Sequence, residues 1–514
     1  ELTPNLTGSN HPVTGVPASD NRLVIGFAFD PNATAENLVA YVSHSALTLS
    51  DGPEWDGKIS KLSGPNLETV EDIIIHLPRS KKDHLTNSIV FGGPDNDMYI
   101  VQGSNSAGGE PDAAWDFRPE RLLAAAVLQV EMDKLPASLP LSVFTTDDIS
   151  VINNAPTNST VMSNGTYNPY SDLSPVTLFA TGVRNAYDAV WHSNGFMYVP
   201  TNGTAGNNST SPNTPASADY APVRRPDGSL FTDLTIPGVD GGETQKDWLF
   251  RAFKGSYHGH PNPLRGEFVL NHGGIEYSGL PGQETEPYVD VAKYPDDLGP
   301  DPAFVEPAFD FGFNKSPNGA LEYRSNAFGG KMKGLLLVVR FSGQDDIIVL
   351  QPGEVSGSIV QSFDNVPGFG GFDDPLEIVE DPKTGNVYLA QYDRGGDTNQ
   401  QLVLLRADDQ ATPVAEIAAA PEELIFETTV NADGDQTELN TVSVSNEGTA
   451  PLEITDVTLT GSFASQFDFT GPTSITLNPG ESQNYDVTYQ PVLDGSDLGY
   501  QPASLSFTSL SLIH

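Results

Sequence analysis

The stretch IVFGGPDNDMYIVQGS, Ile89 to Ser104, holds the pattern that decides the fold of this 514-residue chain. An apolar run is followed by a turn of Gly, Pro, Asp and Asn, and then by a second run centred on Tyr99. Glycine and asparagine accept the positive φ angles of a tight hairpin, and proline presets φ for a turn. The stretch therefore predicts two antiparallel strands joined by a turn.

The same design recurs along the chain, usually with a Gly-rich loop after the second strand. The other copies are FAFDPNATAENLVAYVS (Phe27 to Ser43), AVWHSNGFMYVPTNG (Ala189 to Gly203) and IVEDPKTGNVYLAQYDRGG (Ile378 to Gly396). A recurring hairpin indicates a β-propeller, in which each blade is a small antiparallel sheet. The uneven spacing predicts surface insertions, chiefly at residues 147–170 and 207–245.

Helical periodicity is nearly absent, which favours an all-β protein. The segment PERLLAAAVLQVEMDKL, Pro119 to Leu135, has helical propensity, but AAVLQVEM within it alternates as a strand does. Residues 407–514 contain neither Lys nor Arg. Within them, alternating strands with Asn-Glu-Gly and Asn-Pro-Gly turns predict a β-sandwich of about 100 residues. We expect a propeller over residues 1–407, a linker over 408–420 and a sandwich over 421–514.

The charge balance limits the partners of the chain. With 25 basic and 68 acidic residues the net charge is −43, so nucleic acid and anionic membrane surfaces are poor partners. Such acidity attracts cations, notably Ca²⁺, although a solvated surface suited to a saline exterior is the plainer interpretation. The absence of cysteine excludes disulfides, thiolate metal sites and cysteine nucleophiles. No apolar run approaches the roughly 20 residues that span a bilayer.

Several Asn-x-Ser/Thr sequons would suit a secreted or cell-surface glycoprotein, although such triplets are frequent by chance in a chain rich in Asn and Thr. They are Asn5, Asn32, Asn158, Asn164, Asn202, Asn208 and Asn314. We expect an extracellular or cell-surface location.

His84 is the first candidate for chemistry. It stands in KKDHLTNSIVFGGPD, beside Asp83 and just before the deciding hairpin. Imidazole is the usual general base near neutral pH, and a carboxylate that fixes its tautomer strengthens that role. Neighbours in an extended segment point to opposite faces, so Asp83 need not be the partner. His84 is either a base or an ordinary loop residue.

Three further segments carry candidate residues. The Gly-rich loop at Gly203, which follows the Arg184–Asn185 pair, either offers carbonyls to Ca²⁺ or makes a tight turn. His258 and His260 form either a metal pair or, as we favour, packed loop residues. Arg340 follows an apolar strand, where a cation is expected to meet a carboxylate or an anionic ligand.

Taken in order, the segments DHLTNSIVFGGPDNDMY, GVRNAYDAVW, MYVPTNG, GSYHGHPNP and GLLLVVRFSG resemble the soluble sugar dehydrogenases that use pyrroloquinoline quinone (PQQ), the glucose/sorbosone dehydrogenase group. The resemblance spans about residues 20–400 and implies a six-bladed β-propeller. The tail, with VSVSNEGTAPLEI and ITLNPGESQNYDVTYQP, resembles immunoglobulin-like modules of the ASPM, SPD-2 and hydin type. That resemblance implies a spacer or a module that docks a protein partner.

The first resemblance also implies roles for individual residues. His84 would take the proton of the sugar's anomeric hydroxyl while hydride passes to the quinone. Asn185 would hydrogen-bond the cofactor, and the carbonyls of Gly203 and Thr204 would help to hold a Ca²⁺ that polarises the quinone. Arg340 lies near a family lysine that contacts the cofactor, one residue out of register.

Two positions depart from the family. Its last propeller segment supplies two arginines to the cofactor's carboxylates, whereas FGGFDDPLEIVEDPKTGN has Phe372, Asp373 and Asp374 here. A family carboxylate near the pocket is replaced by Ser104. Two functions therefore stay open. One is a PQQ- and calcium-dependent aldose dehydrogenase. The other is a non-catalytic extracellular propeller that acts in carbohydrate or surface-glycan binding, adhesion, or surface or filament assembly.

Overall fold

A computed structural model of the chain describes residues 5–204, 216, 222–231, 236, 238–241, 244–268, 301, 303–392, 400–406, 415–421, 424–426, 438–461, 463–490 and 503–509. The fold is almost entirely β, as the sequence predicts. The chain divides into two compact units. The larger comprises Glu1–Glu322, Gly334–Val379 and Tyr388–Leu405, and the smaller comprises Tyr323–Lys333, Glu380–Val387 and Arg406–His514.

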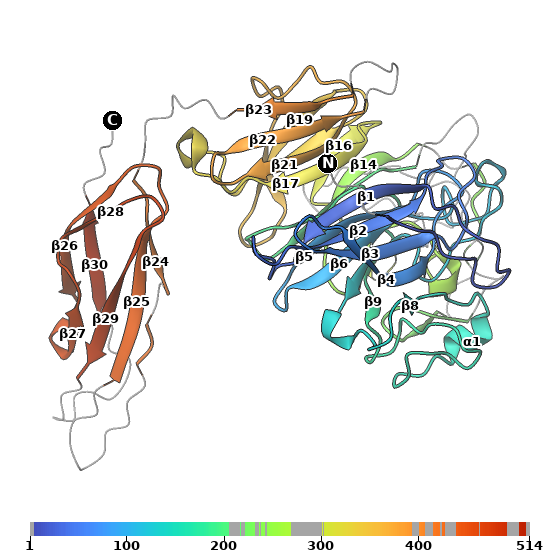
Figure 1. Cartoon of the computed structure of the whole chain (residues 1–514), viewed down its shortest axis with the longest axis horizontal. Coiled ribbons are helices and arrows are strands. Elements are labelled where there is room, and N and C mark those ends of the chain that lie inside the picture. Colours follow the sequence, from blue (N-terminus) through green and yellow to red (C-terminus); the bar gives the residue numbers. More distant parts are fainter. Residues whose placement is uncertain are drawn as a thin grey trace, which may run out of the picture. The chain divides into compact units, whose positions relative to one another are not determined.

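The larger unit is a succession of mainly antiparallel sheets whose strands follow one another in the chain (Figure 1). The first sheet has β1 (Arg22–Phe29), β2 (Val39–Ala46), β3 (Gly57–Ser63), β4 (Thr69–Leu77) and the parallel β8 (Leu141–Ser142). The second has β5 (Thr86–Gly92), β6 (Asp97–Gln102), β7 (Ala126–Val130), β9 (Val176–Thr181) and the parallel β15 (Ser256–Tyr257).

The next sheets repeat the order. The third has β10 (Val190–Trp191), β11 (Met197–Thr201), β14 (Lys246–Ala252) and β16 (Phe309–Phe313). The fourth has β17 (Pro317–Glu322), β18 (Leu336–Arg340), β19 (Asp346–Pro352) and β20 (Ile359–Phe363). The fifth has β21 (Pro375–Asp381), β22 (Asn386–Gln391) and β23 (Leu402–Leu405), and its Glu380–Val387 hairpin end is counted with the smaller unit. A short pair, β12 (Val223–Arg224) with β13 (Leu230–Phe231), and the helix α1 (Ile149–Asn153) lie in the insertions.

Neighbouring sheets pack face to face, and the alternation of side chains explains how. In β11, Met197 and Val199 join the core with the second sheet, whereas Tyr198 joins the core with the fourth. The first strands of successive sheets also contact one another: β1 meets β5, β5 meets β10 and β10 meets β17. Successive small, mainly antiparallel sheets that pack in this way are the arrangement of propeller blades. The number of blades, six in the prediction, stays a prediction.

The deciding hairpin is confirmed. Strands β5 and β6 pair antiparallel around a turn in which Gly93 and Asn96 have φ of 74° and 55°. The segment with mixed signals, residues 119–135, forms the strand β7 and a 3₁₀ turn at Met132–Lys134, not a long helix. All but one of the side chains of β7 are buried between neighbours, so tertiary packing outweighs helical propensity there. The insertion at residues 147–170 is described, whereas most of residues 207–245 lies outside the described residues.

The smaller unit holds a β-sandwich (Figure 1). One sheet has β24 (Ile417–Ala420), β25 (Glu438–Asn446), β29 (Ser482–Tyr489) and β27 (Phe467–Thr470); the other has β28 (Ile475–Leu477), β26 (Leu452–Thr460) and β30 (Ser504–Ser509). Both sheets supply one core, with Val444 and Tyr485 from the first and Ile454 from the second. The immunoglobulin-like type of this sandwich stays a prediction.

The predicted linker, residues 408–420, needs one correction. Its last residues form β24, which pairs antiparallel with β25 from Ile417 opposite Asn446 to Ala420 opposite Ser443. The partly buried Ala419 packs against the sandwich core, so this Ala-rich run is a strand. Residues 408–414 lie outside the described residues.

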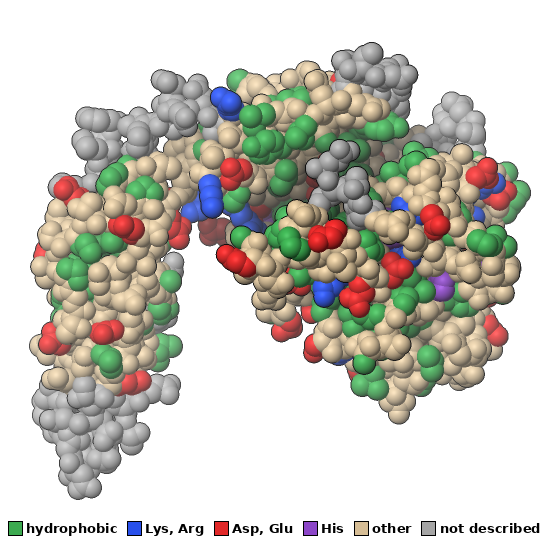
Figure 2. Space-filling model, viewed as in Figure 1, with side chains coloured by type: hydrophobic (Ala, Val, Ile, Leu, Met, Phe, Trp, Pro, Cys, Tyr) green, Lys and Arg blue, Asp and Glu red, His purple; other side chains and the backbone are tan. Residues whose placement is uncertain are grey.

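Acidic side chains are scattered over the drawn face of the molecule and do not form one patch (Figure 2). Among the described residues, no helix is long and apolar enough to cross a membrane.

Candidate functional site

One end of the second and third sheets brings together most of the predicted site residues. His84 precedes β5, Ser104 follows β6, Arg184 and Asn185 lie between β9 and β10, and Gly203 follows β11. Backbone hydrogen bonds tie these loops. The amide of Ser104 donates to the Arg184 carbonyl over 2.7 Å, and the amide of Asn202 donates to the Asn185 carbonyl over 3.0 Å. Loops from separate parts of the chain are thus held in one cluster.

His84 is buried and its ring packs against Trp115, with the ring centroids 4.4 Å apart. Its Nδ1 lies 3.2 Å from the Ser104 carbonyl oxygen and 2.9 Å from Ser104 Oγ. A carbonyl oxygen only accepts, and the Ser104 hydroxyl donates its own proton to the Ser106 carbonyl over 2.8 Å. Nδ1 therefore carries the imidazole proton, and Nε2 carries the lone pair.

Burial lowers the pKa of His84 well below its ordinary value, and the positive charge of Arg184 lowers it further. The ring is therefore neutral at physiological pH. Asp83, its neighbour in the chain, makes no recorded hydrogen bond to it among the described residues, and Ser104 is the partner instead. A neutral imidazole with a lone pair on Nε2 is chemically a proton acceptor.

Arg184 supplies a fixed positive charge beside His84. Its Nε donates to the Ala107 carbonyl and its Nη1 to the Gly203 carbonyl, each over 3.0 Å. Burial lowers the pKa of Arg184 to about 10, although the negative charges of Asp83 and Asp247 act to raise it. The guanidinium therefore stays protonated at neutral pH. The sequence predicts no separate role for Arg184, although its place beside Asn185 is a usable signal.

Asn185 lies against the strand that follows His84. Its Oδ1 is 3.4 Å from Asn87 Nδ2, which also donates to the Ala186 carbonyl over 2.6 Å. The structure thus brings Asn185 and the His84 segment together. Its contact with a cofactor stays a prediction.

The carbonyls of Gly203 and Thr204, the predicted calcium ligands, already accept protein hydrogen bonds. Gly203 accepts from Arg184, and the Thr204 carbonyl accepts from the amide of Gln245 over 2.8 Å. Each oxygen keeps a second lone pair for another partner. A Cβ at Gly203 would lie 2.1 Å from the Lys246 carbonyl oxygen, so only glycine fits. The part of the chain that the structure describes has no group of three or more His, Asp or Glu placed to hold a metal.

The two histidines of the His-x-His pair have different protein partners, as the packed-loop interpretation predicts. His258 Nε2 lies 2.9 Å from Ser256 Oγ and its ring stacks on Phe250, whereas His260 Nε2 lies 3.0 Å from Glu120 Oε1. Burial acts to raise the pKa of Glu120, but hydrogen bonds from His260 and neighbouring groups outweigh it and hold that pKa below its ordinary value. Glu120 is therefore ionised, and His260 donates to it.

Several buried polar atoms around this cluster lack a hydrogen-bond partner. They are Trp115 Nε1, Thr204 Oγ1, Gln245 Nε2 and His260 Nδ1. Trp115 packs on His84, and Gln245 receives the amide of Thr204 on its Oε1 over 3.0 Å. An unpaired buried polar group costs about 1–3 kcal/mol, so a polar ligand or water that satisfied these atoms would be favoured.

Arg340 meets an anion, as predicted, but that anion belongs to the protein. Its Nε and Nη2 pair with both carboxylate oxygens of Asp346 over 2.8 and 2.6 Å, and Nη2 also contacts Asp364 over 2.8 Å. Among the described residues, no recorded contact joins Arg340 to the His84 cluster. A cofactor contact of Arg340 stays a prediction.

No protein-family model and no curated protein matches the sequence. Among solved structures, the PQQ-bound form of aldose sugar dehydrogenase from Streptomyces coelicolor is 13% identical, with a TM-score of 0.39, over 78% of this chain and 82% of that chain. The PQQ domain of pyranose dehydrogenase from Coprinopsis cinerea is 11% identical, with a TM-score of 0.39, over 78% and 88%. At TM-scores this low, these similarities assign no role to any residue of this chain.

Proposed function

We propose that the chain is an oxidoreductase that oxidises an aldose or related sugar with a bound quinone of the PQQ type. The observation that carries the proposal is the state of His84, a buried neutral imidazole whose Nδ1–H is fixed by Ser104. A ring held in this tautomer has its lone pair on Nε2, where it can accept the proton of a sugar hydroxyl. The motif resemblance of residues 20–400 supplies the class of substrate and cofactor.

The donors around His84 have the chemistry to hold the quinone part of such a cofactor. Arg184 supplies a fixed charge, and Trp115 Nε1 and Gln245 Nε2 are buried N–H groups that lack an acceptor. Quinone and carboxylate oxygens are acceptors, so these donors and the Asn185 amide would hold them. When bound, the quinone supplies the acceptor for the hydride removed from the sugar carbon.

The carboxylates of the cofactor would have fewer cationic partners than in the family. Asp373 and Asp374 stand where the family has arginines, and Arg340 is already paired with Asp346 and Asp364. A Ca²⁺ on the free lone pairs of the Gly203 and Thr204 carbonyls would offset part of the negative charge. We therefore expect PQQ binding that depends on calcium.

The protein residues would act on the proton. His84 Nε2 would accept it from the sugar hydroxyl oxygen, and Ser104 would keep the ring oriented while the imidazolium forms. The positive charge of Arg184 would disfavour the imidazolium form of His84. His84 would therefore be a weak base until an anion binds beside the ring. The alternative of a non-catalytic binding propeller rests on the departures from the family at Ser104, Asp373 and Asp374.

The testing experiment titrates the purified chain with PQQ and Ca²⁺, follows the quinone absorbance, and then adds aldoses with an artificial electron acceptor. We expect saturable binding and turnover. His84→Ala should retain binding and lose roughly 10²- to 10⁴-fold in turnover, the usual contribution of a general base.

His11→Ala, which changes a histidine outside the cluster, is the matched control and should turn over normally. If tens of micromolar PQQ with Ca²⁺ gave no binding, the proposed function would be wrong.

A further inference from the structure

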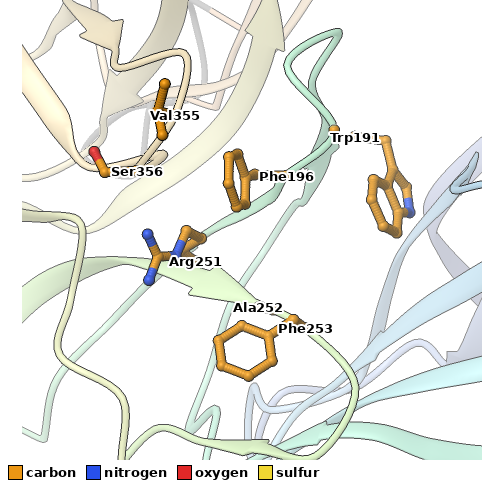
Figure 3. Close-up of a pocket in the computed structure, with 8 residues that line it drawn as sticks. Trp191, Phe196, Arg251, Ala252, Phe253, Val355 and Ser356 are labelled. Carbon is orange, nitrogen blue, oxygen red and sulfur yellow. The ribbon is translucent and has the colours of Figure 1, made fainter.

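A pocket lies in the larger unit at the opposite end of β11 and β14 from Gly203 and Gln245. Strand β11 starts at Met197, opposite the last residue of β14, Ala252, and it is this end that adjoins the pocket. The cavity has a volume of about 420 Å³, within the range of small-molecule sites. Its lining includes Trp191, Phe196, Arg251, Phe253, Val355 and Ser356 (Figure 3).

Arg251 is the charged group of this pocket. Its guanidinium lies over the Phe196 ring, 5.3 Å from the centroid, and Figure 3 shows it between the turn that carries Ser356 and the ring of Phe253. Its Nε is buried without a hydrogen-bond partner, and within the described ranges no carboxylate pairs with it. Arg121 and Arg340 have carboxylate partners, and Arg79, which has none, donates to backbone carbonyls instead. Arg251 has neither kind of partner among the described residues, so its guanidinium is available to an anion from outside.

The rest of the lining is mainly apolar. The rings of Trp191, Phe196 and Phe253 surround the cavity, and Phe253 is 44% exposed. Val355 is 94% exposed at the turn between β19 and β20. Apart from the Arg251 guanidinium and the buried indole N–H of Trp191, the polar side-chain group of the lining is the Ser356 hydroxyl. The Ser356 hydroxyl oxygen accepts from the Ser358 amide over 3.2 Å, so its proton remains available to a ligand.

We propose that this pocket binds a small aromatic carboxylate. The ring would stack among the three aromatic side chains, and the carboxylate would accept from the Arg251 guanidinium and the Ser356 hydroxyl. A sugar acid fits less well, because its many hydroxyl groups would face apolar rings with few polar partners. This inference does not depend on the proposed dehydrogenase function, since the pocket shares no residue with the His84 cluster.

The test is a fluorescence titration of the full chain with 2-naphthoate, beside the uncharged 2-naphthamide. We expect saturable 1:1 binding of 2-naphthoate that weakens as salt rises. Arg251→Gln should lower the affinity for 2-naphthoate roughly 10- to 100-fold, the range of a charge-assisted hydrogen bond, and leave 2-naphthamide nearly unchanged. Lys254→Gln removes a charge three positions along the chain, in the turn after β14 and outside the lining, and should bind as the unaltered chain does.

A second variant separates loss of the site from misfolding. Val355→Asp places a carboxylate at an exposed position of the lining, so it should fold normally and weaken 2-naphthoate binding several-fold more than it weakens 2-naphthamide binding. The proposal is overturned if 2-naphthoate does not bind saturably, or if it binds Arg251→Gln as tightly as the unaltered chain. Glucuronate binding at least as tight as 2-naphthoate binding would overturn the aromatic class of ligand.

Discussion

At the scale of single residues, Ser104 decides what His84 can do. The serine fixes the tautomer through its carbonyl and hydroxyl oxygens but brings no charge to the ring. A carboxylate at this position would fix the same tautomer and also stabilise the imidazolium. The pKa of His84 is therefore low because the ring is buried and because it lies near Arg184 with no carboxylate at position 104 to compensate that charge.

Ser104→Asp should raise the pKa of His84, because the new carboxylate lies beside Nδ1–H. The measurement is an NMR titration of the His84 ring between about pH 5 and 8, which needs no cofactor. In the unaltered chain the signal should stay that of a neutral ring throughout, and in Ser104→Asp it should begin to titrate. Ser104→Ala, which adds no charge, should not. A midpoint near 6.5 in the unaltered chain would contradict this account.

His44 in β2 offers a stability test of the same kind. Its Nδ1 accepts from Arg22 Nε over 3.0 Å, and burial followed by the charges of Arg22 and Lys58 lowers its pKa to about 2. In the unfolded chain His44 has its ordinary pKa of about 6.5, so below this pH the unfolded chain binds a proton at His44 and the folded chain does not. The free energy of unfolding therefore decreases as the pH falls from 6.5 towards 2.

His44→Asn should therefore reduce the dependence of the free energy of unfolding on pH by about 1.4 kcal/mol per pH unit in this window. Urea unfolding of both chains at several pH values measures the two slopes. The slope, not the absolute stability, is the readout, because the variant also loses hydrogen bonds. Equal slopes would mean that His44 is protonated in the folded protein.

At the scale of elements, the local sequence pattern predicts strands and turns well, but it predicts poorly which strands pair with or pack against one another. The hairpin of β5 and β6 follows from alternation and from Gly93 and Asn96, which are all local signals. Residues 126–130 form β7 in a segment with helical propensity, because both faces are covered by other strands. The strand β24 was mistaken for linker because its Ala-rich sequence is informative only beside β25.

Gly203→Ala tests how the loop after β11 is held. The added Cβ would lie 2.1 Å from the Lys246 carbonyl oxygen, so the loop must move away from β14 and from Arg184. We expect a loss of about 1–3 kcal/mol in the free energy of unfolding, as for other overpacked sites. Gly370→Ala, whose Cβ would meet nothing closer than 3.7 Å, is the control for thermal or urea unfolding and should be nearly neutral. Similar losses in both variants would exclude the steric explanation.

At the scale of the whole molecule, charge is the dominant feature. A net charge of −43 on 514 residues means strong self-repulsion in the folded state at low ionic strength. Salt screens that repulsion over a Debye length of about 10 Å at 0.1 M. Soluble salt should therefore stabilise the fold without any specific binding.

We expect the urea midpoint at neutral pH to rise as NaCl increases from about 0.01 to 1 M, where the Debye length falls from about 30 to 3 Å. Near pH 4, where many carboxylates are protonated, the same increase in salt should have much less effect. Circular dichroism at both pH values measures the two series. A midpoint that falls with salt at neutral pH would show that attractive ion pairs outweigh the repulsion.

The all-β class, the hairpins and the sandwich pattern of the tail could be predicted from the sequence, because alternation and turn residues act over a few neighbouring positions. The sequence also pointed to His84, Asn185 and Gly203 as members of one site, and the structure places them together. It gave no way to foresee that His260 pairs with Glu120, because these residues lie 140 positions apart.

The protonation state and the partners of each candidate residue could be found only from the tertiary structure. Ser104 and not Asp83 sets the His84 tautomer, and Asp346 with Asp364 occupies Arg340. Arg251 stands without a carboxylate in its pocket among the described residues. The physical reason is the same in each case: protonation and pairing depend on which atoms lie within about 3 Å, and packing between distant segments sets those distances.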